Sequence, residues 1–313
     1  RLQRRSDDPR RERDPGTGER IFGALANLTA AALVTTLVAG SVAQMGVPVL
    51  SQAVSRSSVI NAIQTVTPDP VDEALARVRA AIFETGIPTI DRALGGITAA
   101  PAPPPVDVST DPLEAAAASV ARISGTAFAC GQNQTGSGFV VATDLVVTNA
   151  HVVAGVDNPV IELPNGRVVD GRIVLFDSEH DVAVISAPDL GAAALTLDDG
   201  PVGEVGVVNG YPHGGPFTTV PAEVLAVSNE RVADIYGAST AVREVLTLAA
   251  DVKPGNSGGP VVATDGDVIG LVFARAANAE RIGYALSTAQ LSQLIDGVDA
   301  DSAAVASGAC IAG

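Results

Sequence analysis

The sequence has few of the residues on which metal sites, disulfide-rich folds and clustered redox centres depend. Its 313 residues include only two cysteines, Cys130 and Cys310, and three histidines that lie far apart. Two cysteines exclude a disulfide-dense small protein and a four-cysteine zinc site, and the wide spacing of the histidines argues against a metal cluster. We therefore expect neither a metal nor a cofactor.

Positive charge is also scarce over most of the chain. From Glu114 onward there are 8 Lys+Arg against 23 Asp+Glu, and Lys253 is the single lysine. Binding to nucleic acid depends on cationic contacts with the phosphates. This composition argues against nucleic acid as a partner.

One long run of the sequence lacks charge altogether. No charged residue lies between Arg20 and Arg56, and residues 21–50 exceed the roughly 20 residues that a transmembrane helix needs. The alternative is a buried helix of a soluble protein, but no neighbouring segment could cover so apolar an element. Arginines crowd the segment before the run, so the positive-inside rule predicts that residues 1–20 are cytoplasmic and that the chain after about residue 50 lies outside the membrane.

Residues 51–113 predict a short helix followed by a spacer. PDPVDEALARVRAAI, residues 68–82, has a proline and acidic residues at its start and apolar residues at helical spacing. Residues 99–112, AAPAPPPVDVSTDP, are rich in proline and predict an extended spacer. We place the boundary of the folded domain there, and assign residues 114–313 to that domain.

The periodicity changes to that of β-strands from about residue 114. About a dozen short β-branched segments follow one another, separated by turn residues, and Asn165-Gly166 and Asp265-Gly266 are typical hairpin tips. Because no long helix intervenes, the pattern predicts an all-β sandwich or a pair of barrels. ALSTAQLSQLID, residues 285–296, predicts one closing helix.

Ser257 lies in the glycine-rich stretch VKPGNSGGPVV, residues 252–262. Such a stretch fits a tight turn, and it also fits a nucleophilic serine if a base and an orienting acid are present elsewhere. His151, at the end of an apolar strand where the chain turns, is the candidate base. His180 and His213 lie in polar loops, where we expect ordinary surface residues.

Two aspartates are candidates for the acid. Asp181 stands just before the apolar strand of HDVAVIS, where a carboxylate can be half buried and aimed, and Asp177 is the second candidate. The order His151, Asp181, Ser257 excludes an α/β-hydrolase, in which a histidine follows the serine of G-x-S-x-G. The subtilisin order would need an acid before His151, in helical surroundings.

TNAHVV, HDVAVI and GNSGGP resemble the three catalytic blocks of chymotrypsin-fold serine proteases, especially the bacterial ones, over residues 114–297. The resemblance implies two β-barrels and cleavage of a protein or peptide. His151 would be the base, Asp181 the orienting acid and Ser257 the nucleophile. The backbone N–H groups of Gly255 and Ser257 would form the oxyanion hole.

The same resemblance gives expectations for the substrate pocket. Asp251 stands six residues before Ser257, where trypsin-like enzymes place the acid that binds basic side chains, but Lys253 could neutralise it, so a basic preference is left open. Val272, Phe273 and Ala274 are expected to form the edge that pairs with the substrate backbone.

One departure from the digestive proteases lies beside the serine. Asn256 replaces the aspartate that binds a new amino terminus in digestive relatives. Asparagine cannot form that ion pair, and we expect it to make a local hydrogen bond instead. Activity should therefore not require cleavage in the spacer.

More narrowly, the apolar run, the spacer, the NGYPHGGPFTT and DIYG segments and the flanking cysteines resemble the MarP family of actinobacteria. In that family a CvpA-like membrane domain precedes a periplasmic protease linked to survival of acid and oxidative stress. HtrA proteases share the catalytic blocks but carry PDZ modules, for which the roughly 17 residues after the closing helix leave no room.

An extracytoplasmic location favours one Cys130–Cys310 disulfide over two unrelated thiols. Two other functions stay open: a catalytically inactive barrel acting as a membrane-anchored binding module, and a membrane part that is itself the functional element.

Overall fold

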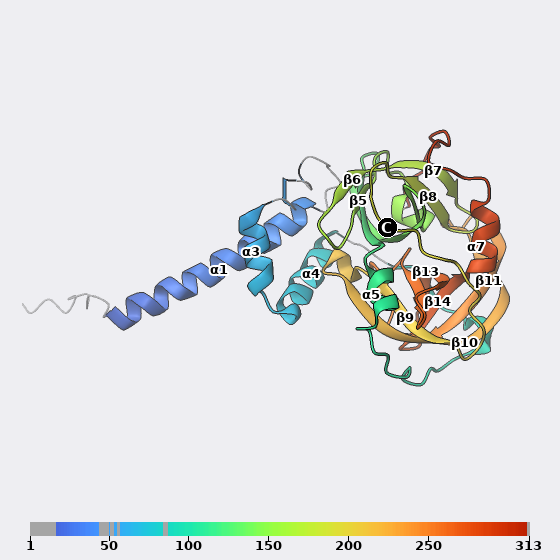
Figure 1. Cartoon of the computed structure of the whole chain (residues 1–313), viewed down its shortest axis with the longest axis horizontal. Coiled ribbons are helices and arrows are strands. Elements are labelled where there is room, and N and C mark those ends of the chain that lie inside the picture. The colour runs from blue at the N-terminus through green and yellow to red at the C-terminus, as the bar shows by residue number, and fades with distance from the viewer. Residues whose placement is uncertain (1–16, 44–49, 51–52, 55–56, 84–86, 312–313) are drawn as a thin grey trace, which may run out of the picture.

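A computed structural model describes residues 17–43, 50, 53–54, 57–83 and 87–311 (Figure 1). In the described part of the chain before the folded β domain, the structure has the helices α1 Thr17–Ala43, α3 Ser58–Val66 and α4 Asp69–Phe83. The helix predicted over residues 68–82 is confirmed by α4, whereas α3 was not predicted. α4 packs beside η2, the short turn Pro212–Gly214 of the β domain.

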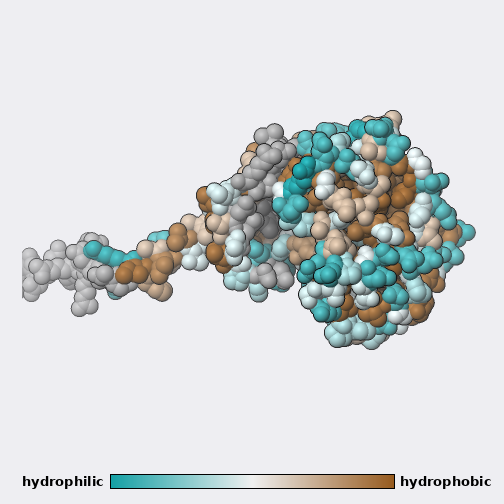
Figure 2. Space-filling view, in the orientation of Figure 1, coloured by the Kyte–Doolittle hydropathy of each residue, from teal (hydrophilic) through white to brown (hydrophobic). Residues whose placement is uncertain are grey.

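Helix α1 is apolar around most of its circumference. Its 21 residues Glu19–Ala39 are long and apolar enough to cross a membrane, as far as length and composition decide. Large apolar side chains on it face solvent, among them Phe22 at 76% and Leu28 at 69% exposure, and Figure 2 shows hydrophobic surface along the projecting helix. The predicted span of residues 21–50 extends past the helix, and its residues 44–49 lie outside the described residues.

The β domain consists of two seven-stranded sheets, which confirms the predicted all-β, two-barrel fold. The first has the order β6-β5-β2-β3-β4-β8-β7, with β2 Val120–Ala127, β3 Gln132–Ala142, β4 Leu145–Thr148, β5 Val160–Glu162, β6 Val168–Asp170, β7 Arg172–Asp177 and β8 Val182–Ser186. The second has the order β1-β13-β12-β9-β10-β11-β14 and is closed by pairing of β13 with β14. Its strands are β1 Thr89–Ile90, β9 Val205–Gly210, β10 Thr218–Ala233, β11 Thr240–Ala249, β12 Pro260–Ala263, β13 Val268–Ala276 and β14 Ile282–Ser287.

Local turn chemistry accounts for the hairpins and the closing helix. Gly166 (φ 79°) lies between the antiparallel strands β5 and β6, and Gly266 (φ 96°) between β12 and β13, so both predicted hairpin tips are confirmed. Helix α7, Thr288–Ile295, begins where the Ser287 side chain accepts a hydrogen bond from the Gln290 N–H. This helix confirms the closing helix predicted from the sequence.

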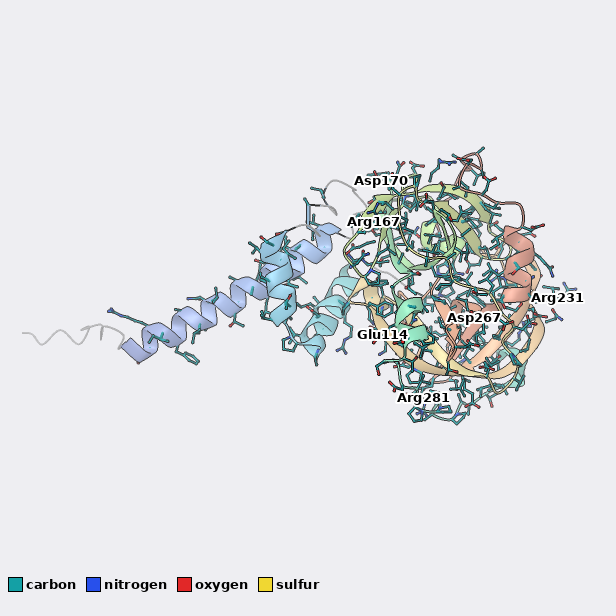
Figure 3. All side chains as sticks on the ribbon, viewed as in Figure 1. Glu114, Arg167, Asp170, Arg231, Asp267 and Arg281 are labelled. Atoms are coloured by element: carbon teal, nitrogen blue, oxygen red, sulfur yellow. A yellow bond between two sulfur atoms is a disulfide. The ribbon has the colours of Figure 1, made fainter. Side chains whose placement is uncertain are left out.

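Each barrel has its own apolar core, and a third cluster joins them. Every residue of β8 is buried: its first four residues are apolar, and the hydroxyl of its last residue, Ser186, donates to the Ala300 carbonyl at 2.8 Å. Phe139 of the first barrel and Tyr284 of the second belong to the shared cluster. Charged side chains such as Arg167, Asp170 and Arg281 lie at the periphery (Figure 3). The two barrels therefore pack through apolar side chains.

Two segments outside the barrels also pack on them. Residues 87–97, which precede the predicted spacer, lie on the second barrel, where Leu94 is completely buried. Pro112 lies in the first turn of α5, Asp111–Ala117. After α7 the chain returns to the first barrel, where the Val305 N–H donates to the Ile173 carbonyl at 2.9 Å. This return brings Cys310 to the turn that contains Cys130.

Candidate active site

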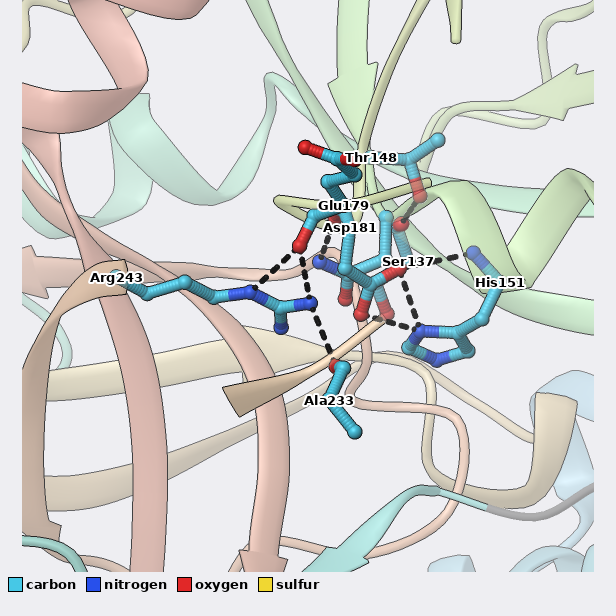
Figure 4. Close-up of polar contacts among 8 residues, drawn as sticks. Ser137, Thr148, His151, Glu179, Asp181, Ala233 and Arg243 are labelled. Atoms are coloured by element: carbon cyan, nitrogen blue, oxygen red, sulfur yellow. Dashed lines mark hydrogen bonds and ion pairs between the residues drawn. The ribbon is translucent and has the colours of Figure 1, made fainter. Parts of the chain in front are cut away.

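His151 is held at the start of a short helix by one carboxylate. It lies on α6, Ala150–Val153, directly after β4. Its backbone N–H donates to Asp181 Oδ1 at 2.9 Å, and its ring Nδ1 lies 2.8 Å from Oδ2 and 3.0 Å from Oδ1 of the same residue. His151 is 9% exposed. Backbone and ring are thus fixed together, with Nδ1 turned toward the carboxylate (Figure 4).

Asp181 is buried at the point where the turn after β7 enters β8. It is 2% exposed and has φ of 61°, the left-handed region that aspartate tolerates better than most residues. The Asn149 side-chain amide donates to the Asp181 carbonyl at 2.9 Å. These contacts aim the carboxylate at His151 and leave its position little freedom.

The second candidate acid, Asp177, is engaged elsewhere. Its Oδ1 accepts hydrogen bonds from the backbone N–H groups of Glu179 and His180, both at 2.9 Å. Its Oδ2 lies 2.7 Å from Nδ1 of His180. Asp177 therefore closes the β7–β8 turn and contacts His180, and neither residue is an isolated surface group.

Ser257 lies in a tight turn between β11 and β12 on the second barrel. A Cβ at Gly255, whose φ is 94°, would lie 2.3 Å from the Tyr211 carbonyl oxygen and 2.7 Å from the His213 nitrogen. Only glycine fits there without a rearrangement. His213 belongs to η2, and its N–H donates to the Pro254 carbonyl at 2.6 Å. It therefore supports the turn rather than standing at the open surface.

Two further contacts close this turn. Asn256 Oδ1 accepts a hydrogen bond from the Lys253 N–H at 2.9 Å, so its side chain bonds locally. The Gly258 N–H donates to the Val272 carbonyl at 2.8 Å, which ties the turn to β13. The buried serine is thereby placed beside the strand expected to bind substrate backbone.

Ser137 connects the Ser257 turn to the first barrel, a role that the sequence analysis missed. Its N–H donates to the Ser257 carbonyl at 2.8 Å, and its hydroxyl donates to the Gly255 carbonyl at 2.7 Å. The same hydroxyl accepts from the Tyr211 N–H at 2.9 Å. The Thr148 hydroxyl in turn donates to the Ser137 carbonyl at 2.6 Å. The GSGF block that contains Ser137 was the available signal, but it reads equally well as an ordinary strand.

Two reactive atoms in this region lack partners. Ser257 Oγ and His151 Nε2 are buried, and within the described residues neither has a hydrogen-bond partner. Buried polar atoms are nearly always paired, and the other buried side-chain atoms without partners among the described residues are Thr110 Oγ1, Asn149 Oδ1 and Asn209 Nδ2. Ser257 Oγ and His151 Nε2 are the two of these that could take part in proton transfer, which is consistent with a site that completes its bonds with a third group. Catalytic hydrogen bonds are often formed only once substrate is present.

A cleft of about 710 Å³ is lined by His151, Asp181 and Phe273, among others, whereas Ser257 is not among its lining residues. A smaller hollow of about 310 Å³ is lined by Asp251 and Val252. Asp251 forms an ion pair with Lys253 at 3.2 Å, and their side chains are 59% and 46% exposed. Val272, Phe273 and Ala274 lie together on β13.

Burial and charge perturb two side chains around the site. Burial raises the pKa of Tyr211, which keeps the phenol neutral, and its hydroxyl donates to the Val120 carbonyl at 3.3 Å. Burial lowers the pKa of Arg243, although the carboxylates of Asp181, Asp177 and Asp234 oppose this effect. Among the described residues there is no group of three or more His, Cys, Asp or Glu side chains that could hold a metal ion.

A disulfide joins Cys130, in the turn after β2, to Cys310 in the C-terminal tail, with their Cα atoms 6.4 Å apart. The bond closes a loop of 180 residues in sequence separation. Ile311, the next residue, lines the large cleft. The tail is thus tied to the first barrel next to the site.

Comparison with known proteins agrees with this geometry. Residues 136–271 match the family model of the trypsin-like peptidase domain. The serine protease Rv3671c of Mycobacterium tuberculosis is 32% identical over 269 residues, which cover 84% of this chain and 67% of that one. The putative serine protease HhoB of Synechocystis is 35% identical over 156 residues, covering 49% of this chain and 37% of its own.

Solved structures give the same result. The crystal structure of the Rv3671c protease in its active form has a TM-score of 0.65 at 32% identity, and covers 72% of this chain and 99% of its own. The HtrA-type protease AlgW with a tripeptide has a TM-score of 0.53 at 26% identity, and covers 59% of this chain and 62% of its own.

Proposed function

We propose that this chain cleaves proteins outside the cytoplasmic membrane through His151, Asp181 and Ser257. The premise is that it belongs to the trypsin-like serine proteases and is a serine endopeptidase. One observation carries the assignment of these residues. The buried carboxylate holds the His151 ring through Nδ1, while Nε2 and the serine Oγ are buried and unpartnered among the described residues. An activated serine requires a base that is held by an acid at one ring nitrogen and has no hydrogen-bond partner at the other, so that this second nitrogen can accept the serine proton.

The geometry supports a sequence of acyl-transfer steps. Ser257 Oγ would attack the carbonyl carbon of the scissile peptide bond while His151 Nε2 accepts its proton, and the same proton would then pass to the leaving amine. Asp181 would keep the other ring proton on Nδ1 and stabilise the imidazolium. A water molecule activated by His151 would release the acyl group by the reverse route.

The oxyanion formed in the attack would be stabilised by the N–H groups of Gly255 and Ser257. The positive φ of Gly255 and its close approach to the Tyr211 carbonyl fix how this part of the turn can lie. Removal of one donor from such a hole reduces the rate about 10²–10³-fold. Because Asn256 bonds to Lys253 within the turn, the assembled site has no need of a newly cut amino terminus.

We assign α1 to the membrane as an anchor. Its large apolar side chains are exposed along the helix, and only 6% of its most apolar stretch is buried by the rest of the chain. By the positive-inside rule, the arginines before the helix support a cytoplasmic position for residues 1–20 and a position of the β domain on the other side. The disulfide agrees with an oxidising compartment.

The resemblance to the MarP family suggests the biological setting. We propose that α1 is the end of a CvpA-like membrane domain and that the enzyme acts during acid and oxidative stress of the cell envelope. Loss of survival at acid pH and in peroxide in a deletion strain, restored by the wild-type gene but not by Ser257→Ala, would support this role. Equal restoration by both genes would instead favour a function that does not depend on peptide-bond cleavage.

Labelling with a fluorophosphonate probe tests the chemistry directly. The full chain, extracted in detergent, should be labelled and should cleave peptides, whereas Ser257→Ala should do neither. Ser292→Ala, which changes an exposed serine on α7, is the matched control and should behave as wild type. Absence of labelling in the folded wild-type chain would favour the alternative, an inactive barrel that acts as an anchored binding module.

A further inference from the structure

Arg243 is a buried cation that the catalytic steps do not use. It lies on β11, is 2% exposed and is the largest fully buried side chain among the described residues. Its Nε and Nη2 donate to the Glu179 carbonyl at 3.2 and 2.8 Å, and Nη2 also donates to the Ala233 carbonyl at 3.0 Å. Burying a guanidinium without a carboxylate hydrogen-bonded to it is unfavourable. Such a group is therefore a candidate for a specific role.

These hydrogen bonds act on the turn that carries the catalytic acid. Glu179 lies two residues before Asp181, and the turn enters β8 through the left-handed conformation of Asp181 (Figure 4). The Ile235 N–H donates to the Ser178 carbonyl at 3.1 Å, so the loop between β10 and β11 holds the same turn at a second point. The second barrel thus fixes the part of the first barrel that aims the carboxylate at His151.

The guanidinium also reaches the expected substrate edge. Its Cζ lies 5.3 Å from the centre of the Phe273 ring, at cation–π distance. The three carboxylates of Asp177, Asp181 and Asp234 interact with it electrostatically. The other titratable or charged groups that line this region are His151, His180, Asp91, Arg92 and Arg231. One side chain therefore contacts the acid's turn and the strand beside the serine.

We propose that Arg243 is a positioning residue of the peptidase site. It fixes the Glu179–Asp181 turn and Phe273 relative to each other, and it supplies positive charge beside the His151–Asp181 pair. This inference rests on the proposed role of Asp181. A cation near the pair opposes the protonation of His151, so its removal should favour the imidazolium. The branched guanidinium is needed to donate hydrogen bonds to both carbonyls, whereas a lysine could supply the positive charge alone.

Two substitutions in the full chain separate these contributions. Arg243→Met should reduce kcat about 10- to 100-fold, the range caused by misplacing a catalytic group by up to about 1 Å. It should also move the acid limb of the pH profile of kcat/KM to higher pH. Arg243→Lys should lower kcat while leaving the acid limb in place. Arg167→Met, which removes an exposed arginine of the first barrel, is the control.

Fluorophosphonate labelling normalises each rate to the fraction of competent sites. The idea is overturned if the normalised kcat and the acid limb of Arg243→Met match wild type, because a purely structural residue would change only the amount of folded enzyme. It is equally overturned if lysine shifts the acid limb as far as methionine does. Failure of the wild-type chain to label would instead contradict the proposed function itself.

A second and independent observation concerns the segment of residues 87–92, named here the cleft strap. The Arg275 N–H donates to the Pro88 carbonyl at 3.1 Å, and the Ala277 N–H donates to the Ile90 carbonyl at 3.0 Å. The segment therefore forms β1 and pairs parallel to β13. Residues 87–92 also line the large cleft.

The cleft strap is anchored at both ends. Ile87 is 5% exposed and packs in the apolar cluster of the second barrel, together with Val252 and Val272. At the other end Leu94 is fully buried, and its carbonyl accepts from the Thr247 hydroxyl at 3.3 Å. The Gly95 N–H donates to Glu230 Oε1 at 2.9 Å. The segment is thus held on the barrel by side chains as well as by backbone pairing.

The hydrogen bonds along β13 show what this pairing occupies. The N–H and the carbonyl of Val272 bond to Gly259 and Gly258, and the Arg275 N–H donates to Pro88, so Phe273 lies between two occupied positions. The register of β13 on β14 shifts between Val272 and Ala274, which interrupts the regular pairing at Phe273. The cleft strap takes the N–H of Arg275 and leaves Phe273 as the nearest position for an added strand. We infer that the cleft strap is a specificity determinant that limits how far a substrate backbone can extend along β13.

Substrate length tests this inference, which also depends on the proposed peptidase activity. Reporter peptides with one, two or four residues before the scissile bond are built on a sequence selected by cleavage of a peptide library. In the full wild-type chain, four residues should give little advantage over two. Ile87→Asp should raise kcat/KM for the four-residue peptide about tenfold, which corresponds to roughly 1.4 kcal/mol, and leave the one-residue peptide unchanged.

Hydrogen exchange provides a readout apart from activity. The amides of Arg275 and Ala277 should be protected in wild type and in Thr89→Ser, an exposed control, and should exchange faster in Ile87→Asp. Ile87→Ala serves if the aspartate variant does not fold. An identical length dependence in wild type and the Ile87 variants, despite faster exchange, would overturn the inference, as would unprotected Arg275 and Ala277 amides in wild type.

Discussion

Replacement of Asp181 by asparagine should inactivate the enzyme without unfolding it. In the structure Oδ1 accepts the His151 backbone N–H at 2.9 Å, while Oδ2 lies 2.8 Å from the ring Nδ1. An asparagine that keeps its oxygen toward the backbone N–H turns its NH₂ group toward Nδ1. Nδ1 must then accept, so the ring proton moves to Nε2, where it blocks proton transfer from Ser257.

The opposite orientation of the amide is no better. It would place an NH₂ group against the His151 backbone N–H and leave two donors facing each other in a buried site. The wrong tautomer in a site of this type lowers kcat about 10⁴-fold, which is about 5 kcal/mol of transition-state stabilisation. Almost no volume changes, so the thermal unfolding midpoint should move by no more than a few degrees.

The assay is steady-state peptidase kinetics on Asp181→Asn with Asp177→Asn as the matched control. The Asp177 carboxylate accepts from the Glu179 and His180 N–H groups, a function that the oxygen of an asparagine can retain. Asp177→Asn should therefore stay within a few-fold of wild type. Inactivation by Asp177→Asn together with near-normal activity of Asp181→Asn would refute the assignment of the acid.

Three further changes test other parts of the site and its setting. Gly255→Ala should lower kcat at least about 10²-fold, because the added Cβ would collide with the Tyr211 carbonyl and displace an oxyanion donor. Gly203→Ala is the control, because Gly203 has a similar positive φ but nothing within 4 Å of an added Cβ, and its kcat should not fall. Equal activities of the two variants would contradict the oxyanion assignment. Reduction of the disulfide, or Cys130→Ser, should lower the melting temperature and modestly reduce activity. The reason is that closing a loop of 180 residues allows up to about 5 kcal/mol of stabilisation through the entropy of the unfolded chain. Two thiols titrating in the unreduced protein would argue against the bond. Protease added to spheroplasts should digest the β domain but spare residues 1–20, and release of the full chain by alkaline carbonate would count against the anchor.

Much of the fold follows from patterns that are local in the sequence. The β-branched runs, the hairpin tips at Gly166 and Gly266 and the closing helix depend on turn chemistry and alternation, and the structure agrees with each of them. The apolar run likewise predicted the helix now described as α1. Short α3 was missed because it is nine residues long and has no acidic residue in its first turn.

The parts of the site that depend on long-range contacts were not predictable in this way. Arg243 meets Glu179 across 64 positions of sequence, and Ser137 meets Gly255 across 118. Their neighbours in sequence give no sign of these partners. The cleft strap was assigned to a connecting region because residues 89–90 form only two residues of strand, whose partner, β13, comes more than 170 residues later.

These long-range contacts have a common arrangement, in which each barrel holds the loop of the other barrel that carries the proposed catalytic residues. The first barrel supplies His151 and Asp181, but Arg243 and Ile235 of the second barrel fix the turn before Asp181. The second barrel supplies Ser257, but Ser137 of the first barrel binds the carbonyls on either side of Asn256. A small shift between the barrels must therefore move the acid and the nucleophile at once. Since rate falls steeply with misplacement of reacting groups, the proposed triad makes the packing between the barrels a direct determinant of activity.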